Sequence, residues 1–537
     1  MFSLEAAQKA LFAQCDSYVA LQKPDGAIHR ADWGLDDPGA TCSLVALCLY
    51  TGHHLEAVSR ALDYLEAYQR PSGLTDLRDC NFDSSPDAGF ILQAMCPAIS
   101  SPNPLPLLGG GGEERAGGGG RSRTEAFLRR MVAGTLTGGF HTPNHRWVMS
   151  AGLALAEKCL PDLSEQIHPV IQSYLAEGFD LNADSAWIER SAGVYDAICA
   201  KSLLILAECG YETEACLEAV RRNLTLNLHL FHADGTIETG LSRRQDQGTR
   251  TVPSSLIIPL LWAGKVLDEP RFLQAAAFLQ ERVPTDGYSL MEFLRRFGEP
   301  GAIKPKLPES YALHYPVLQA HRIRRGELSV TVFGGTTRLL HLVRGQAELV
   351  SVKISQAYFG VGRFVGDSNR EEKGAVVLRS EGKLSPYRPG DELPLGRPVP
   401  PENYQAMRAE RALRRVADCT SELEVKALED GSGVSLRYVT LDGLDRVPAQ
   451  LALDFAVGGV WETDDTAFQP QAGQVIFLKS GVGRMHYGRD VIEISPGVSA
   501  HQMWAMRDSE PAAGLVRVLL TFLTPVDYFI ILKTTSL

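Results

Sequence analysis

Two short polar segments contain the residue types that could carry out chemistry in this chain. The first runs from residue 139 to 147 and places the amide of Asn144 next to the imidazole of His145. The second leads to Tyr195, 51 residues after Asn144 and 50 after His145. An imidazole and a phenol can transfer protons, and an amide can hydrogen-bond to charge that develops on a substrate. The two segments therefore contain residue types, in Asn144, His145 and Tyr195, that are capable of proton-transfer chemistry.

Each polar segment stands where a helix is expected to begin. An apolar helical pattern follows the first segment at once, from Val148 to Leu155. Pro143 disfavours helix in the residue before it, so we expect the first segment to form the N-terminal mouth of that helix. The second segment, residues 184–191 with Tyr195, comes one helical hairpin later. Segments at equivalent positions of successive hairpins would face each other across a cleft.

Residues 1–322 repeat a helical pattern that is punctuated by tight turns. The spacing is 47 residues from Gly26 to Gly73 and 52 from Gly235 to Gly287, the length of two helices with their loops. Glycine supplies the positive φ that a tight reversal needs. Hairpins of this period form an open solenoid or a closed toroid. We predict an (α/α) toroid of about six hairpins, because aromatic and polar residues follow the turns and suit a functional rim.

Residues 323–537 change to an alternation of period two. It is clearest in the runs 328–333, 348–354 and 434–439, which Gly- and Pro-containing turns separate without intervening helices. This pattern predicts a C-terminal antiparallel β-sandwich, with a helical stretch at about 404–416 as the exception. Within the helical part, the Pro- and Gly-rich segment at about 97–123 predicts a flexible insertion. It is no phosphate-binding loop, because no strand precedes it and no Gly-Lys-Ser follows.

Composition limits the partners and the compartment. A chain of 537 residues favours two domains, and its net charge of −11 argues against nucleic acid and anionic membranes as partners. No apolar run approaches the roughly 20 residues of a membrane helix. The first residues lack the basic and apolar regions of a signal peptide. Ten cysteines without a CxxC pair suggest reduced, buried thiols, so we expect a cytoplasmic protein.

A helical toroid followed by an antiparallel β-sandwich, with Asn-His at a hairpin mouth and Tyr about fifty residues later, resembles the polysaccharide lyases. The heparinase II/III and alginate lyase families share this layout, and there the toroid Asn or His is followed by a catalytic Tyr at similar spacing. Here Glu189-Arg190-Ser191 precedes Tyr195 as in similar family segments. Such families often carry a His-rich strand motif in the sandwich. This chain departs from that pattern, because its sandwich histidines His341, His486 and His501 are isolated.

The resemblance implies cleavage of a glycosidic bond to a uronic acid by β-elimination. Tyr195 would act as base, acid or both, while Asn144 and His145 neutralise the substrate carboxylate or assist proton transfer. A phenol ionises only near pH 10 in water, so a cation such as Arg190 or His145 would have to stand beside it.

Eight further residues are candidates for binding the substrate. The tryptophans would stack on sugar faces, and the paired arginines would hold carboxylates through bidentate contacts. The two sandwich residues lie in a segment that is a candidate to supply groups to the cleft, and His314 and Tyr315 near the domain junction are further candidates. The eight candidates are Arg146, Trp147, Trp187, Arg190, Arg243, Arg244, Tyr358 and Arg363.

The predicted partner is a uronic-acid-containing oligosaccharide or polysaccharide. The chemistry requires no cofactor, and no motif indicates a structural divalent metal. Whether the chain forms a homo-oligomer stays open at this point. Two other functions also stay open: a toroid glycoside hydrolase with paired carboxylates, and a non-catalytic carbohydrate-binding protein. The carboxylates of the hydrolase alternative are Asp32, Asp36, Asp37, Asp83 and Asp87.

Overall fold

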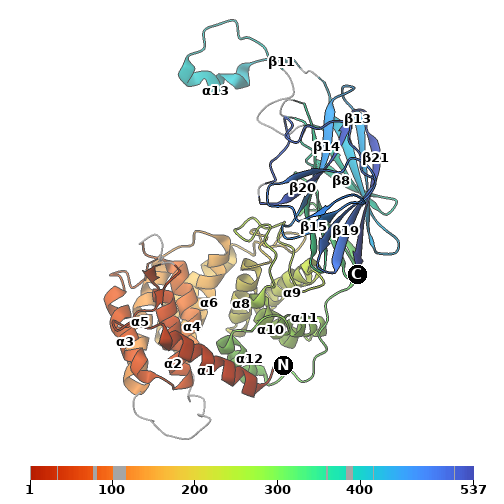
Figure 1. The fold of residues 1–537 in the computed structure, drawn as a ribbon. Coiled ribbons are helices and arrows are strands. Elements are labelled where there is room, and N and C mark those ends of the chain that lie inside the picture. Colours follow the sequence, from red (N-terminus) through yellow and green to blue (C-terminus); the bar gives the residue numbers. More distant parts are fainter. Residues whose placement is uncertain are drawn as a thin grey trace. The chain divides into compact units, whose positions relative to one another are not determined.

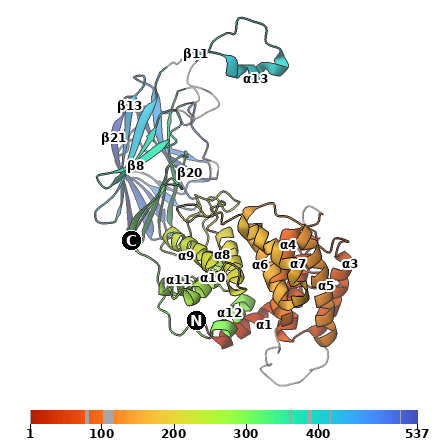
Figure 2. The same ribbon diagram turned by 180° about the vertical axis from the view of Figure 1, so that it is seen from behind.

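The computed structural model describes residues 2–32, 34–76, 82–100, 117–358, 361–382, 391–414, 417–512 and 514–537. The chain divides into two compact units. A helical unit comprises Met1–Phe231 and Gly235–Leu307, and a β unit comprises His232–Asp234 and Pro308–Leu537. Figures 1 and 2 show the helices in the red-to-green part of the chain and the strands in the green-to-blue part.

The described part of the helical unit contains six helical hairpins. Each even-numbered helix packs on the next, from α2 through α4, α6, α8 and α10 to α12, and α1 contacts both α12 and α2 to close the ring. This is the predicted (α/α) toroid. The hairpins are α1 Leu4–Ala20 with α2 Pro38–Thr51, α3 Leu55–Tyr68 with α4 Ser85–Ser100, α5 Gly117–Thr137 with α6 Pro143–Cys159, α7 Ser164–Ala176 with α8 Tyr195–Glu208, α9 Thr213–Leu230 with α10 Ile257–Val266, and α11 Pro270–Gln280 with α12 Gly287–Phe297. Two 3-10 turns, η1 Pro161–Leu163 and η2 Ser254–Leu256, precede α7 and α10.

The inner helices α2, α6 and α10 are buried on most sides, whereas α3 buries one apolar stripe. Close approach of α4 and α6 depends on small residues. A Cβ on Gly152 would lie 2.7 Å from the backbone oxygen of Gly89. At the turns, Gly26 and Gly73 have positive φ, and a Cβ on Gly26 would lie 1.9 Å from the oxygen of Arg60. These contacts fix the N-terminal ends of the inner helices relative to one another.

The predicted insertion at 97–123 is narrower than expected. Pro97–Ser100 complete α4, and Gly117–Arg123 already belong to α5, where packing of the helix on its neighbours outweighs the weak helix propensity of glycine. Residues 101–116 lie outside the described residues.

The β unit is a sandwich of two sheets around one apolar core, to which both sheets contribute. Neighbouring strands are antiparallel, except for the parallel pair β17 and β20. The eight-stranded sheet has the order β17 Val475–Phe477, β20 Val516–Leu523, β14 Pro448–Phe455, β7 Ala347–Gln356, β6 Leu340–Arg344, β5 Leu328–Phe333, β4 Ala320–Arg325, β3 Ser310–Tyr315. The nine-stranded sheet has the order β16 Ala467–Phe468, β15 Val460–Glu462, β18 Gly483–Tyr487, β19 Asp490–Ser495, β21 Asp527–Ser536, β13 Gly433–Asp442, β12 Thr420–Ala427, β9 Ala375–Ser380, β8 Ser368–Glu372.

Three local features differ from the sequence-based prediction or add to it. The β unit begins at Pro308, before the predicted residue 323, because β3 and β4 already pair with the eight-stranded sheet. The expected helix at 404–416 is limited to α13 Tyr404–Met407, flanked by the 3-10 turns η3 Pro401–Asn403 and η4 Arg408–Glu410. It ends because β11 Leu413–Arg414 pairs with β10 Asp391–Glu392. A further two-stranded pair, β1 His29–Arg30 with β2 Leu35–Asp36, precedes α2.

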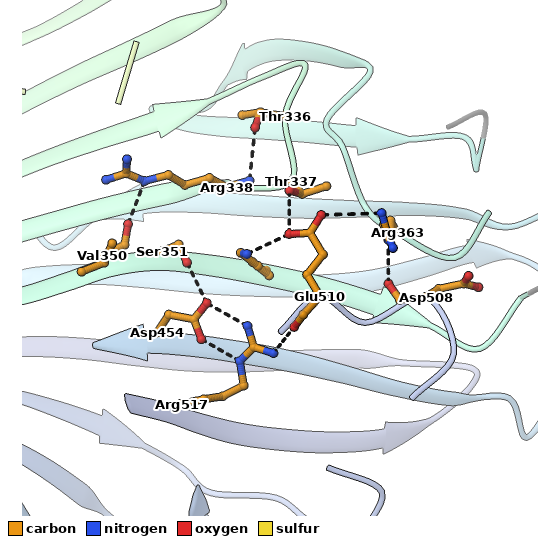
Figure 3. A network of polar contacts seen from close by, with 11 residues as sticks. Thr336, Thr337, Arg338, Val350, Ser351, Arg363, Asp454, Asp508, Glu510 and Arg517 are labelled. Carbon is orange, nitrogen blue, oxygen red and sulfur yellow. Dashed lines mark hydrogen bonds and ion pairs between the residues drawn. The ribbon is translucent and has the colours of Figure 1, made fainter. Parts of the chain in front are cut away.

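A polar network ties a loop of the sandwich to its strands (Figure 3). Arg517 on β20 forms a bidentate ion pair with Asp454 on β14, with N···O distances of 2.6 and 2.9 Å, and Ser351 donates a further hydrogen bond to this carboxylate. Glu510 in the loop binds Lys353 of β7 at 2.7 Å. Every charge in this network has a partner, as buried ions require.

None of the helices within the described ranges is long and apolar enough to cross a membrane. Each cysteine in the described part of the chain is a free thiol, and seven of those nine are buried.

Candidate active site

Glu189 joins the two predicted polar segments. Its carboxylate accepts hydrogen bonds from the backbone N–H of Asn144 at 3.2 Å and from Asn144 Nδ2 at 2.8 and 3.0 Å. Arg244 Nη1 lies 2.5 Å from Glu189 Oε1. Asn144 is fully buried and Glu189 is 5% exposed, so a charged carboxylate is tolerated here only because these donors surround it.

Arg244 continues the connection to Tyr195. The Tyr195 hydroxyl accepts a 3.2 Å hydrogen bond from Arg244 Nη2 and a 2.7 Å hydrogen bond from Gln245 Nε2. The guanidinium carbon of Arg244 lies 4.4 Å from the centroid of the tyrosine ring. Asn144 and Tyr195 therefore belong to one network, linked through Glu189 and Arg244.

The network is positioned by the N-terminal ends of α6 and α8 and by the loop after residue 238. Ser191 Oγ accepts the backbone N–H of Tyr195, which opens α8. Asp246 binds both the N–H of Gly193 and the hydroxyl of Ser242, and thereby holds the loop with Arg244 against the α8 mouth. Local structure thus brings three distant segments together.

His145 is placed beside the network but does not have the predicted charge. Its ring contacts His141 at 4.6 Å and Phe90 at 6.3 Å between centroids. Burial, followed by the charges of His141 and Arg244, lowers the pKa of His145 to about 4. His145 is therefore neutral near pH 7 and cannot supply the positive charge for Tyr195 that the sequence suggested. Arg244 occupies that position instead.

Two atoms of the predicted catalytic residues have no partner. Among the described residues, Asn144 Oδ1 and His145 Nδ1 are buried without a hydrogen bond. Because Asn144 Nδ2 is held by Glu189, the amide presents an acceptor rather than the predicted donor. Unsatisfied buried polar atoms are costly and are rare outside functional sites.

We expect replacement of His145 by glutamine to change the pH dependence of stability. Between pH 6.5 and about 4 the unfolded chain binds a proton at His145 that the folded chain does not, so its pKa shift makes the free energy of unfolding fall as pH decreases. The variant should lose this contribution. Urea denaturation at several pH values would measure it, and wild-type and variant curves that stay parallel across this window would contradict the expectation.

Three predicted binding residues are structural instead. Arg146 is buried, and its guanidinium pairs with Glu177 and Asp180, each at 2.9 Å. Trp147 is completely buried; its Nε1 donates to Asp180 and its ring stacks on Phe179. Both side chains belong to the first turn of α6 and contact residues that directly follow α7.

Trp187 is also unavailable for stacking on a sugar. It is 1% exposed, because an isolated bridge to Leu181 turns the indole into the protein. Neither tryptophan therefore offers a sugar the flat face that was predicted.

Arg190 and Arg243 fit the predicted role better. Burial and the nearby charge of Arg243 lower the pKa of Arg190. The backbone N–H of Arg243 donates to the oxygen of Glu189, which places both arginines next to the network. Over the described ranges, neither guanidinium forms an ion pair or hydrogen bond, so two adjacent positive charges are available for an anion.

Tyr358 and Arg363 lie in the β unit and make contacts within it. The Tyr358 hydroxyl accepts the backbone N–H of Leu444. Arg363 donates to the backbone oxygen of Asp508 at 3.1 Å and lies 3.9 Å from Glu510 (Figure 3). These contacts hold both side chains in loops of the sandwich.

Two groups of side chains within single units offer ligand atoms for a metal. Asp16, His53 and His54 form one in the helical unit, and His314, His321 and Glu371 form the other in the β unit. The rings of His314 and His321 stack at 4.0 Å with an interplanar angle of 3°. Nitrogen lone pairs of parallel stacked rings do not converge on one point, so we assign no metal to this group.

A cleft of about 440 Å³ opens in the helical unit. Phe90 lines it and its ring also contacts that of His145, so the cleft adjoins this one of the three proposed catalytic residues. Asp37 at the start of α2 and Asp87 in the first turn of α4 are among its lining residues. All of these groups lie at the N-terminal ends of inner helices.

The sequence did not predict Glu189 or Gln245 as site residues, although both lie in segments that contain predicted site residues. The available signal for Glu189 was an acidic residue within the polar segment 184–191 that precedes Tyr195. Nothing in the sequence showed that its partners would be Asn144 and Arg244, because these lie 45 and 55 residues away.

Comparison with known proteins gives structural matches only. No protein-family model matches the sequence, and no curated protein does. A heparan sulfate lyase from Pedobacter heparinus matches with a TM-score of 0.52 at 10% identity, covering 92% of this chain and 75% of that chain. A heparinase III matches with a TM-score of 0.54 at 7% identity, covering 92% and 76%. A Paenibacillus xanthan lyase matches with a TM-score of 0.54 at 10% identity, covering 99% of this chain and 57% of the lyase.

These matches show the fold, at identities too low to show the activity. They confirm the resemblance drawn from the sequence at the level of architecture. The chain shares the fold of the heparinase-type polysaccharide lyases, a helical toroid followed by an antiparallel β-sandwich.

Proposed function

We propose that the protein is a lyase that cleaves a glycosidic bond to a uronic acid in an oligosaccharide or polysaccharide by β-elimination. The observation that carries this proposal is the environment of the Tyr195 hydroxyl. Arg244 and Gln245 both donate to its oxygen, which is the arrangement that stabilises a phenolate. One donor preorganised toward developing charge contributes about 2.7–4 kcal/mol.

The proposed reaction begins at the carbon α to the uronate carboxylate. The phenolate of Tyr195 takes the proton from this carbon, and the electrons of the broken C–H bond move into the carboxylate as an enolate forms. Collapse of the enolate makes a C=C bond and breaks the bond to the glycosidic oxygen. Tyr195, now protonated, returns its proton to the departing oxygen on the same face of the sugar.

Arg190 and Arg243 would neutralise the carboxylate while negative charge accumulates on it. They are suited to this because they form no ion pair over the described ranges and stand next to the network. Asn144 orients Glu189 and so acts as a positioning residue, while its buried Oδ1 accepts a hydrogen bond from the substrate. His145, neutral near pH 7, would assist proton transfer through Nδ1.

A second candidate function is hydrolysis of a glycosidic bond. Asp37 and Asp87 both line the cleft, and burial raises the pKa of Asp87, as a general acid requires. The other carboxylates of this alternative are less suited. Asp36 binds Lys23 and His29, and Asp83 faces Arg70.

Product analysis on a panel of uronate-containing glycans separates the two candidates. Elimination creates a conjugated double bond that absorbs in the near ultraviolet, whereas hydrolysis adds water and creates no chromophore. The lyase proposal expects the chromophore, its loss in Tyr195→Phe and its persistence in Asp87→Asn. Products without a chromophore that disappear in Asp87→Asn would instead establish the hydrolase.

A further inference from the structure

Three possible metal ligands from two segments of the helical unit lie close together. Asp16 belongs to the C-terminal part of α1, and His53 and His54 form the turn between α2 and α3. Asp16 Oδ1 lies 2.8 Å from His54 Nε2 and 3.6 Å from His53 Nε2. The ligand atoms of the three residues all lie within 4.8 Å of one another. Both imidazole rings therefore place Nε2 near the same carboxylate oxygen.

These separations suit a divalent ion of the size of zinc. Zinc binds imidazole nitrogen at about 2.0–2.1 Å and carboxylate oxygen at about 2.0–2.2 Å, so two ligand atoms of a tetrahedral centre stand about 3.4 Å apart. The two measured distances from Asp16 Oδ1 lie on either side of this value. All three side chains are partly exposed, so small rotations can bring them onto one ion.

One histidine beside one exposed carboxylate is an ordinary surface ion pair and indicates no metal. Here a second imidazole shares the carboxylate oxygen. In addition, Glu56 Oε1 lies 3.6 Å from His54 Nδ1, the ring nitrogen that is not directed at Asp16. A carboxylate on this side favours the tautomer with the proton on Nδ1, which leaves the Nε2 lone pair for a metal, as in carboxylate–histidine–zinc sites.

The turn between α2 and α3 holds the two rings in a converging orientation. His54 has φ +54° and ψ +42°, a left-handed conformation that is uncommon for residues other than glycine. The ring of His53 packs edge-on against Phe12 of α1, with 5.8 Å between centroids. The two imidazoles are 3.9 Å apart with an interplanar angle of 58°. Unlike the parallel rings of His314 and His321, tilted rings allow their nitrogen lone pairs to meet at one point.

We propose that Asp16, His53 and His54 bind a divalent transition-metal ion of the zinc class, with water in the remaining position. Two imidazoles and one carboxylate suit zinc, whereas Mg²⁺ and Ca²⁺ prefer oxygen ligands. Cys15 is no fourth ligand, because its Sγ is buried against Cys48 Sγ at 3.7 Å.

The proposed metal site is separate from the cleft. Asp37 of the cleft precedes the N-terminal end of α2, whereas His53 and His54 follow its C-terminal end. These ends are 14 residues apart, about 21 Å along the helix axis. The ion therefore takes no part in sugar chemistry. It ties the turn after α2 to α1, the helix that closes the ring by packing on both α2 and α12.

Calorimetric titration of the full chain, without a histidine tag, with ZnCl₂ at neutral pH tests the site. Asparagine tolerates the left-handed backbone better than most residues, so it is the replacement for His54. The matched control is His168, an exposed histidine of the helical unit that, over the described ranges, belongs to no group of metal ligands. The proteins compared are wild type, Asp16→Asn, His53→Gln, His54→Asn, Glu56→Gln and His168→Gln.

We expect wild type and His168→Gln to bind one zinc ion per chain. Glu56→Gln should weaken zinc binding by about tenfold, and each ligand variant by more than about 100-fold, which exceeds the usual effect of an outer-shell partner. Zinc should raise the Tm of wild type and His168→Gln by a few degrees, reversibly on addition of EDTA, because it binds the folded chain. Mg²⁺ and Ca²⁺ at the same concentration should leave the Tm unchanged.

Failure of wild type to bind zinc would overturn the proposal, and so would equal zinc affinity in wild type and the ligand variants. Circular dichroism identifies any variant that does not fold, and the remaining variants then decide the result. No sugar enters these measurements, so their outcome is independent of the proposed lyase activity.

Discussion

Tyr195→Phe is expected to lower kcat for elimination by about 10²–10⁴-fold, the contribution of a positioned general acid–base group. Phenylalanine keeps the ring under the Arg244 guanidinium, at the 4.4 Å separation of the native pair, and removes only the hydroxyl. The fold should therefore be retained. Chromophore formation under substrate saturation measures kcat, and circular dichroism checks the fold.

The matched control for this variant is Tyr404→Phe. Tyr404 lies on α13 in the β unit, is 47% exposed and belongs to no part of the network. Its replacement should leave kcat unchanged. If Tyr195→Phe kept more than about half of the wild-type kcat, another group would have to be the base, and the proposed mechanism would fail.

Glu189→Gln is expected to lower both stability and activity. The substitution keeps the volume, but it removes the charge opposite Arg244 and points an amide N–H₂ toward existing donors. Breaking a buried ion pair costs about 3–5 kcal/mol, and we expect about 3 because a quarter of the Arg244 side chain is exposed. Misorientation of Arg244 should also reduce kcat by about 10²-fold.

Two comparisons make this prediction specific. Glu218→Gln removes an exposed partner of Arg221 and should change the free energy of unfolding by less than about 0.5 kcal/mol. A double-mutant cycle of Glu189→Gln with Arg244→Gln should give a coupling energy of about 0.5–3 kcal/mol, whereas additive effects would show that the two side chains act independently. Urea denaturation provides the free energies.

The architecture could be predicted from the sequence because the spacing of apolar residues indicates which face of each element is buried. Apolar residues recur about every 3.6 positions in the first part of the chain and every second position in the second part, because one face of each element is buried. The structure has the helical toroid and the β-sandwich that these two periods predicted. The boundary was harder to place. No residue of β3, Ser310–Tyr315, is fully buried, whereas most residues of β7 are.

The meeting of Asn144 and Tyr195 in one network was also accessible, because about fifty residues is one helical hairpin and both residues open an inner helix. The directions in which the neighbouring side chains point could not be predicted from the sequence. Arg146 and Trp147 follow Asn144 within one turn, and the helix rotates them onto Glu177, Phe179 and Asp180. Their polar and aromatic groups make packing contacts, and a sequence pattern alone cannot distinguish a residue that packs from one that binds a ligand.

The protonation of His145 and the role of Glu189 depend on three-dimensional burial. An imidazole stays neutral well below its ordinary pKa of about 6.5 only when its surroundings exclude water, and that is known only once Phe90 and His141 are placed against it. Likewise, Glu189 connects residues from three segments, and its partners could not be inferred from spacing.

The central claim, elimination at a uronic acid, is tested most directly by cleavage in oxygen-18-labelled water followed by mass spectrometry of the products. Elimination breaks the carbon–oxygen bond without consuming water, so the account predicts fragments whose masses sum to that of the substrate and carry no label. Fragments heavier by one labelled water would mean hydrolysis and would contradict the account.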